Sequence, residues 1–385
     1  MKKILLGTTA LVSAGLVAGP ALAGDPLSVS VSGSVVTGFY VVDADSTAPG
    51  TSYEDTKVAL VARNIDIIAE GTLDNGMTAG VDAKLMLGSD WNSSTSSNAN
   101  FRQLFAYLEG GFGRFEIGGV DGAAYKMHYT SPWFVPGNGV DSPNIYNGVS
   151  TGTGSASTRL STFSLMATDA NKVTYFTPRF AGFQLGASYT PDVSQTLTQP
   201  SANGLGVAAK PASGTGGITD VFEIAANYAG TIGGLDLGLD GFYTDGDGAL
   251  ANTDPKEYGF GASLGYMGFT LGGAYYKSED LGAPTFSTAT APSLAVSGAE
   301  FKTWTAGLSY GTGPWTVGVA YLKGEDDSSG ATNGAETEVW QVGGGYSLGS
   351  GVDLGLDVSF TSDKASSGAQ SYDSTSGGLV LAVSF

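Results

Sequence analysis

Charged side chains in and around one long segment, residues 121–170, are the residues of this chain best suited to a chemical task. Fixed charges beside a narrow passage offset part of the cost of moving an ion out of bulk water. Each of them could equally be a solvated loop charge. The candidates within the segment are Asp121, Lys126, Asp141 and Arg159, and those before it are Arg63, Asp82, Lys84 and Arg102. Further charges that could lie near the same passage are Asp169, Lys172, Asp236 and Asp240.

The chain offers little for catalysis or metal binding. Its single histidine, His128, cannot build a multi-histidine metal site, and no serine stands out as a nucleophile to accompany it. The acidic stretches 245–248 and 325–327 could attract divalent cations, but neither has the spacing of an EF-hand loop. We therefore expect no enzyme activity, no cofactor and no resident metal.

The segment 121–170 is also aromatic. At roughly fifty residues it far exceeds the usual connection of about two to six, and so many rings indicate that it is ordered and packed against something. The rings could form a stacking track for sugars or amphipathic solutes, or they could simply fasten the segment to a wall. The residues concerned are Tyr125, Tyr129, Trp133 and Tyr146.

Outside this segment, apolar and polar residues alternate along short stretches separated by turn residues. In the stretch 352–360, for example, one face carries Val352, Leu354, Leu356, Val358 and Phe360. Such a period of two indicates a β-strand, because in a helix the same residues would scatter around the axis. Stretches of the same kind are 77–87, 235–243, 258–266, 304–310 and 315–321.

The apolar faces of these stretches carry aromatic residues near their ends and aliphatic residues between them, which suits a strand that crosses a bilayer. The opposite faces are rich in Gly and Ser, which indicates a water-filled interior. About sixteen such stretches alternate short turns with longer loops, as in outer-membrane barrels. The sequence therefore predicts an all-β fold, a 16-stranded antiparallel transmembrane β-barrel.

The N-terminus has the order of a secretory signal peptide: Lys2 and Lys3, an apolar run, then small residues before Gly24. We expect a signal peptide at residues 1–23 and the barrel domain at residues 24–385. The chain has no cysteine, so a closed sheet would have to hold the exported domain together. The formal charge of −19 becomes −21 without Lys2 and Lys3, which argues against nucleic acid as a partner and would concentrate cations in a narrow passage.

Two stretches and the last residue resemble the general porins of Gram-negative outer membranes, especially the alphaproteobacterial kind. Residues 101–118 read FRQLFAYLEGGFGRFEIG, residues 171–183 read NKVTYFTPRFAGF, and the chain ends on Phe385. The resemblance extends over the mature chain in architecture, although only these stretches are individually specific.

The resemblance implies a trimeric diffusion channel whose third outward loop folds into the lumen, and residues 121–170 fall where that loop belongs. Porins of this kind usually face loop acids against arginines of the barrel wall, and Arg63 and Arg102 match that role. Gly119 and Val120 stand where the family often has an arginine, which weakens the basic side of such a constriction.

We therefore expect an outer-membrane porin that lets ions and small hydrophilic solutes diffuse passively, with a mild preference for cations. Its expected partners are further copies of the chain in a homotrimer, outer-membrane lipid and lipopolysaccharide, and the diffusing solutes. Two alternatives stay open: a substrate-selective porin for a sugar or an anion, and a non-conducting barrel that acts as a surface adhesin or structural anchor.

Overall fold

The computed structural model describes residues 27–47, 52–86, 100–142, 159–195, 217–250, 253–282, 295–329, 334–364 and 371–385. The expected signal peptide, residues 1–23, lies outside these ranges, as does Tyr146. Within the described ranges, no helix is both long enough and apolar enough to cross a membrane.

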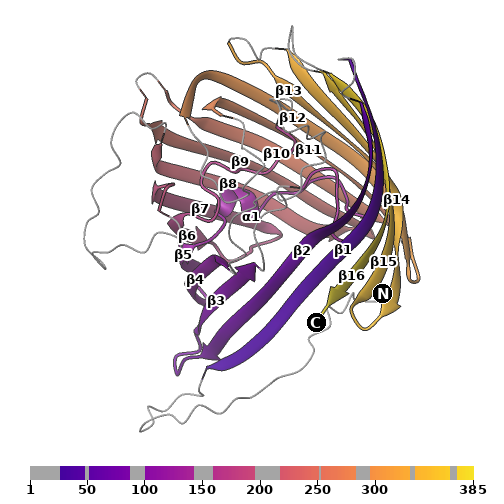
Figure 1. Ribbon diagram of the computed structural model, residues 1–385. Helices are drawn as coiled ribbons and strands as arrows, with labels where there is room; N and C mark the ends of the chain where they lie inside the picture. The colour runs from indigo at the N-terminus through magenta and orange to yellow at the C-terminus, as the bar shows by residue number, and fades with distance from the viewer. Residues whose placement is uncertain are drawn as a thin grey trace.

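Sixteen strands and one short helix make up the regular structure of the described chain (Figure 1). The strands are β1 (Ser28–Ser46), β2 (Tyr53–Thr72), β3 (Thr78–Met86), β4 (Asn100–Gly110), β5 (Gly113–Gly119), β6 (Asn171–Phe176), β7 (Phe183–Asp192), β8 (Ile218–Ile232), β9 (Leu235–Gly248), β10 (Lys256–Tyr266), β11 (Phe269–Leu281), β12 (Ala295–Thr312), β13 (Trp315–Asp326), β14 (Ala335–Gly349), β15 (Val352–Lys364) and β16 (Tyr372–Ser384). The helix α1 spans Ala123–Lys126 between β5 and β6. The strands form one closed antiparallel barrel, which confirms the predicted fold class.

Closure depends on the pairing of the first strand with the last. β1 pairs with β2 on one side and with β16 on the other. At the seam, the Gly33 amide donates to the Phe385 carbonyl at 2.8 Å, and the Phe385 amide donates back to Gly33 at 3.0 Å. A closed ladder leaves no strand edge, so the backbone groups of the wall are bonded within the sheet.

The alternation read from the sequence corresponds to two unlike faces of this wall. On β12, Thr303 and Thr305 are buried, while Trp304 and Leu308 on the other face are exposed. Large apolar side chains that remain exposed around a closed barrel suit a lipid environment. We call these two sides the outer face and the buried face.

The segment between β5 and β6 runs along the buried face on a track of glycines. Its described parts are the first limb, residues 121–142, and the second limb, residues 159–170. A β-carbon at Gly238 would meet the Tyr129 ring at 2.8 Å, and one at Gly318 would meet the Phe134 ring at 2.3 Å. Further along the first limb, Gly343 faces Val135, and Gly355 faces Pro136. The Gly-rich face was expected to border water; along this track it instead receives the first limb.

The first limb crosses the wall from α1 to the seam. Helix α1 contacts β6, β7, β8 and β9, as Figure 1 shows for its place beside β7 and β8. At the other end, Phe134, Val135 and Val140 pack in one buried cluster with Val36 of β1 and Val380 of β16. The limb therefore reaches around much of the barrel circumference.

Gly261 provides a test of this track, because a β-carbon there would lie 2.0 Å from the Tyr129 carbonyl oxygen. We expect Gly261→Ala to displace the first limb from β10 and to lower the free energy of unfolding by about 1–3 kcal/mol, the usual cost of overpacking. The urea midpoint of refolded protein measures this. Gly241→Ala is the matched control, since the nearest atom to its added carbon lies 3.8 Å away. Equal midpoints for the two variants would contradict the arrangement.

Candidate functional site

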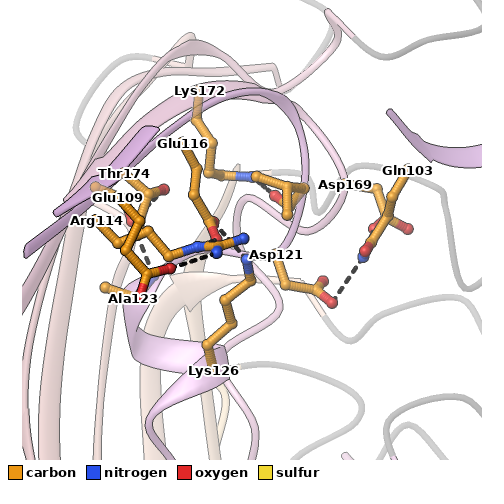
Figure 2. A network of polar contacts seen from close by, with 12 residues as sticks. Gln103, Glu109, Arg114, Glu116, Asp121, Ala123, Lys126, Asp169, Lys172 and Thr174 are labelled. Atoms are coloured by element: carbon orange, nitrogen blue, oxygen red, sulfur yellow. Dashed lines mark hydrogen bonds and ion pairs between the residues drawn. The ribbon is translucent and has the colours of Figure 1, made fainter. Parts of the chain in front are cut away.

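Two acids from the two limbs meet one amide of the wall, as Figure 2 shows for Gln103, Asp121 and Asp169. The Gln103 side-chain amide donates to Asp121 Oδ2 at 2.8 Å and to Asp169 Oδ1 at 2.6 Å. Arg102 donates from Nε to Asp169 Oδ2 at 2.8 Å, and its other end lies 3.9 Å from Asp121. This cluster joins the start of the first limb to the end of the second.

A bulge in β4 lets neighbouring residues serve the same cluster. In the β3–β4 register, Lys84 pairs with Gln103 and Leu85 pairs with Phe101, so Arg102 is the extra residue. On a regular strand, Arg102 and Gln103 would point to opposite faces, and a bulge re-aims one of them. Both side chains therefore reach Asp169.

Burial sets the electrostatics of these limb acids. The pKa of the Asp169 carboxyl is raised because burial disfavours its charge and because Asp121 is nearby, while Arg102 opposes the shift. Lys172 donates to the carbonyls of Val120, Ala167 and Ala170 and thereby ties the end of β5 and the second limb to β6. The cluster is a fastening of the segment, and its acids are occupied by protein partners.

A second group of charges lies at α1, where Lys126 pairs with Glu116 of β5 (Figure 2). Arg114 donates to the same Glu116 at 2.8 Å and to Glu109 at 2.9 Å. Burial lowers the pKa of the Lys126 ammonium, and Glu116 opposes that shift. Lys126 and Arg114 stay partly exposed, with 26% and 29% of their side chains accessible.

The second limb is held by Glu257 of β10, which is fully buried. Its carboxylate accepts hydrogen bonds from Ser164 Oγ at 2.5 Å, the Leu165 amide at 3.1 Å and the Tyr276 hydroxyl at 2.7 Å. The Arg159 guanidinium stacks 3.9 Å from the Tyr276 ring and lies 3.5 Å from Glu257. Arg159 is only 1% exposed, so it anchors the limb.

The predicted candidates thus divide by environment. Asp141 is fully buried and accepts hydrogen bonds from Thr130 and Thr162. Asp121, Arg102 and Arg159 are held in the contacts described above. Asp82 and Lys84 of β3 are partly exposed. Arg63 pairs in register with Val35 on the barrel backbone, and its side chain lies outside the described part of the structure.

Several residues of the site were missed by the sequence reasoning. Arg114 and Glu116 stand two apart on a strand, a spacing that places both on one face and that could have found them. Gln103 and Glu257 carry no such signal, because their roles depend on which limb residues arrive opposite them. Asp66 of β2 pairs in register with Lys84 and joins the partly exposed charges of β3.

The closed barrel, its apolar outer face and a polar segment fastened to its buried face define the class of the protein as an outer-membrane β-barrel channel. Residues 7–366 match the family described as Gram-negative porin. The chain therefore belongs to the Gram-negative porins and resides in the outer membrane, and its family and fold point to a channel rather than an enzyme.

The chain is similar to several known proteins. An uncharacterized protein of Rickettsia conorii is 27% identical over 305 residues, which cover 65% of this chain and 67% of that protein. Among solved structures, the anion-selective porin from Comamonas acidovorans has a TM-score of 0.62 at 16% identity and covers 93% of this chain and 100% of its own. The outer membrane channel DcaP of Acinetobacter baumannii has a TM-score of 0.58 at 14% identity and covers 96% of this chain and 100% of its own.

Substituting Arg102 tests whether the protein needs this cation to keep Asp121 and Asp169 buried. Arg102→Ala leaves Asp121 and Asp169 buried without their cation, so we expect the free energy of unfolding to fall by roughly 3 kcal/mol. Adding Asp169→Asn should recover part of this loss, because it removes one of the two facing charges. Urea unfolding of the two variants measures both effects.

The control for this experiment is Arg179→Ala. Arg179 is exposed and donates to the Gly182 carbonyl, Gln184 and Asn227 near the turn between β6 and β7, so its removal leaves no acid unpaired and should cost about 1 kcal/mol. A loss for Arg102→Ala no larger than for Arg179→Ala would show that the cluster does not hold the limbs.

Proposed function

We propose that the protein is a general diffusion porin whose channel is narrowed by the two limbs inside the barrel and prefers cations mildly. The contacts described above join the limbs to β1 and to the strands from β4 round to β16. Partly exposed charges of the buried face include Asp66 of β2 and Asp82 and Lys84 of β3. This arrangement supports a channel that runs between the limbs and those two strands.

The preference for cations follows from which charges are free. Asp66 and Asp82 are partly exposed, and each has one carboxylate oxygen that is buried without a hydrogen-bond partner among the described residues. Lys84 lies opposite Asp66 in register, and the nearby bases Arg114 and Lys126 are both paired with Glu116. Asp66 and Asp82 form no ion pair shorter than 4 Å among the described side chains, so they can attract cations to the passage, and this is the observation that carries the proposal.

Reversal potentials in a planar bilayer under a salt gradient test the proposal. We expect parent channels to favour cations, and Asp66→Asn combined with Asp82→Asn to lower the cation-to-anion permeability ratio by roughly two- to fivefold, since a charge about 4 Å from an ion in water contributes about 1 kcal/mol or less. Lys84→Gln should shift the ratio in the opposite direction.

Asp245→Asn is the matched control, because the Asp245 side chain lies beside Tyr243 on the outer face. The same chemical change there should leave the ratio as it is. Conducting channels whose ratio does not respond to the double substitution would refute β2 and β3 as the selective wall.

Substrate-selective transport is a second candidate, favoured by the partly exposed Arg114 and Lys126 near this wall. These bases could bind an anionic solute, although both are paired with Glu116. Saturable uptake, or block of conductance by a solute, would identify such a porin. Absence of conductance from correctly folded protein would instead favour an adhesin or anchor.

We further propose that the chain forms homotrimers through the sector around the seam. Aromatic ring pairs link neighbouring strands on the outer face, for example Phe115 with Tyr175, Tyr189 with Phe222 and Trp315 with Tyr346. Such rings prefer the interfaces of a bilayer. Around the seam, the exposed outer residues include the aliphatic Val31, Val35, Val81, Leu104, Leu379 and Leu381, together with Phe39 and Phe101. A largely aliphatic outer face suits contact with another copy.

A bulky ring in this sector should disrupt the assembly. Ala106 lies on β4 with its side chain exposed, and we expect Ala106→Trp to convert most of the trimer to monomer in mild detergent. Ala226→Trp, at an exposed position of β8, is the control and should leave the trimer intact. Native mass spectrometry distinguishes the two. A trimer lost only in the β8 variant would place the contact elsewhere.

A further inference from the structure

The first limb carries one large apolar side chain that the wall does not cover. Trp133 is 43% exposed, whereas Phe134, Val135 and Val140 of the same limb are at most 4% exposed. Trp133 is the only large apolar side chain of the two limbs that is exposed. A ring in this position gives up part of the stabilisation that its burial would supply.

Trp133 points away from the wall. Two positions before it, Ser131 Oγ lies 2.9 Å from Thr305 Oγ1 of β12. Directly after it, the Phe134 ring lies against Gly318 of β13. Both of these residues are buried, so the wall side of the limb is occupied on either side of Trp133. Because the limb lies inside a closed barrel, the side opposite the wall is the interior.

The indole ring of Trp133 is held from behind. The Asn138 amide donates to the Val135 carbonyl at 3.3 Å and closes a tight turn, which brings Gly139 back to Trp133. A β-carbon on Gly139 would lie 2.5 Å from Nε1 and 2.6 Å from both Cδ1 and Cε2 of the ring. A point almost equally distant from three adjacent ring atoms lies over the ring face. The indole therefore stacks on the Gly139 backbone, and its exposed part includes the other face.

Accessible acids flank this part of the limb. Asp236 of β9 stands two residues from Gly238, and Asp353 of β15 stands two residues from Gly355; both glycines receive the first limb. Two residues along a strand span about 7 Å and return to the same face. The two acids therefore lie on the buried face beside the limb, on strands to either side of Trp133. Asp236 is exposed, and Asp353 is partly exposed.

No base of the strands β8–β16 accompanies these acids on the buried face. The strands contain no arginine. Each of their lysines adjoins a buried residue of its own strand, as Lys302 adjoins Phe301 and Thr303, and therefore points to the outer face. These lysines are Lys256, Lys277, Lys302, Lys323 and Lys364. Arg159 of the second limb reaches β10, but it lies against Glu257. The surroundings of Trp133 thus favour a positively charged solute.

We propose that the open face of Trp133 binds substituted ammonium ions as they pass through the channel. The face of an aromatic ring attracts a cation within about 6 Å of its centroid, and tryptophan does so most strongly. The alkyl groups of such an ion also suit an apolar surface. Because the ring is fixed by Gly139, little conformational freedom is lost when the ion binds. The inference rests on the proposed function, since it assigns a class of solute to a channel that prefers cations.

Block of the potassium current by tetramethylammonium tests the site. We expect the block to saturate, and Trp133→Leu to raise its apparent Kd about two- to fivefold, the range for one cation–π contact at an exposed site. Leucine keeps an apolar side chain but lacks the ring. Trp133→Phe should give an intermediate value. Trp340→Leu is the matched control, because Trp340 is 48% exposed on the outer face, and it should leave the block unchanged.

Two results would overturn the proposal. One is an equal apparent Kd for tetramethylammonium in the parent and in Trp133→Leu. The other is block by glucose, a neutral solute, that depends on Trp133 while the block by tetramethylammonium does not. The ring would then be a contact for sugars.

Binding can also be followed without transport. In protein labelled with ¹⁵N and held in detergent micelles, the indole N–H resonance that is missing from Trp133→Leu belongs to Trp133. We expect tetramethylammonium to shift this resonance and glucose to leave it in place. If the shift occurs in a protein that does not conduct or that prefers anions, the proposed function fails while the site stands. A cation-preferring channel without the shift retains the proposed function and refutes the site.

Discussion

Every backbone N–H and C=O group within a bilayer must be bonded inside the protein, and the rest of this structure depends on that constraint. The chain meets it by closing β1 onto β16. Closure fixes the wall but does not by itself cover the buried face. Another part of the chain has to cover this face wherever it is not lined by water, and the two limbs do so.

The limbs pack on the wall because glycines and acids of the strands match their backbone. Inward glycines let the first limb approach the strands closely, while acids of the wall accept hydrogen bonds from the limbs. Glu223 accepts from the Ala124 amide at 3.0 Å, Asp240 from the Tyr129 amide at 2.7 Å, and Asp357 from the Asn138 side chain at 2.6 Å. Irregular backbone carries polar groups without ladder partners, and Glu223 and Asp240 satisfy two of them. Part of the acidic excess of the chain is therefore structural.

The fold could be predicted from sequence because alternation is a local property. A stretch such as residues 352–360 reports its two faces without reference to any neighbour, so the strands and their antiparallel order follow from pattern and turn length. The site could not be predicted in this way. Asp121 and Asp141 look like channel acids in the sequence, but both are buried in the structure. Gln103 donates a hydrogen bond to Asp121, and Thr130 and Thr162 donate to Asp141. Which acids stay free depends on the path of the limbs across the wall, and the bulge at Arg102 shows how one unpaired residue changes which side chains reach a limb.

Some acids of this chain are buried in contacts with the limbs and others are partly exposed. The net charge of the whole chain is therefore a poor guide to ion selectivity. A formal charge of −19 for the whole chain counts acids such as Glu257 and Asp141, which are fully buried and bonded to the limbs. An ion in the passage is affected mainly by nearby charges with water between them, because distant ones are screened within about 10 Å at ordinary salt. In the channel that we propose, the relevant balance is set by a few side chains of β2 and β3. On that proposal, related chains with a similar overall charge would differ in selectivity through single substitutions on those two strands, while the anchoring acids stay the same.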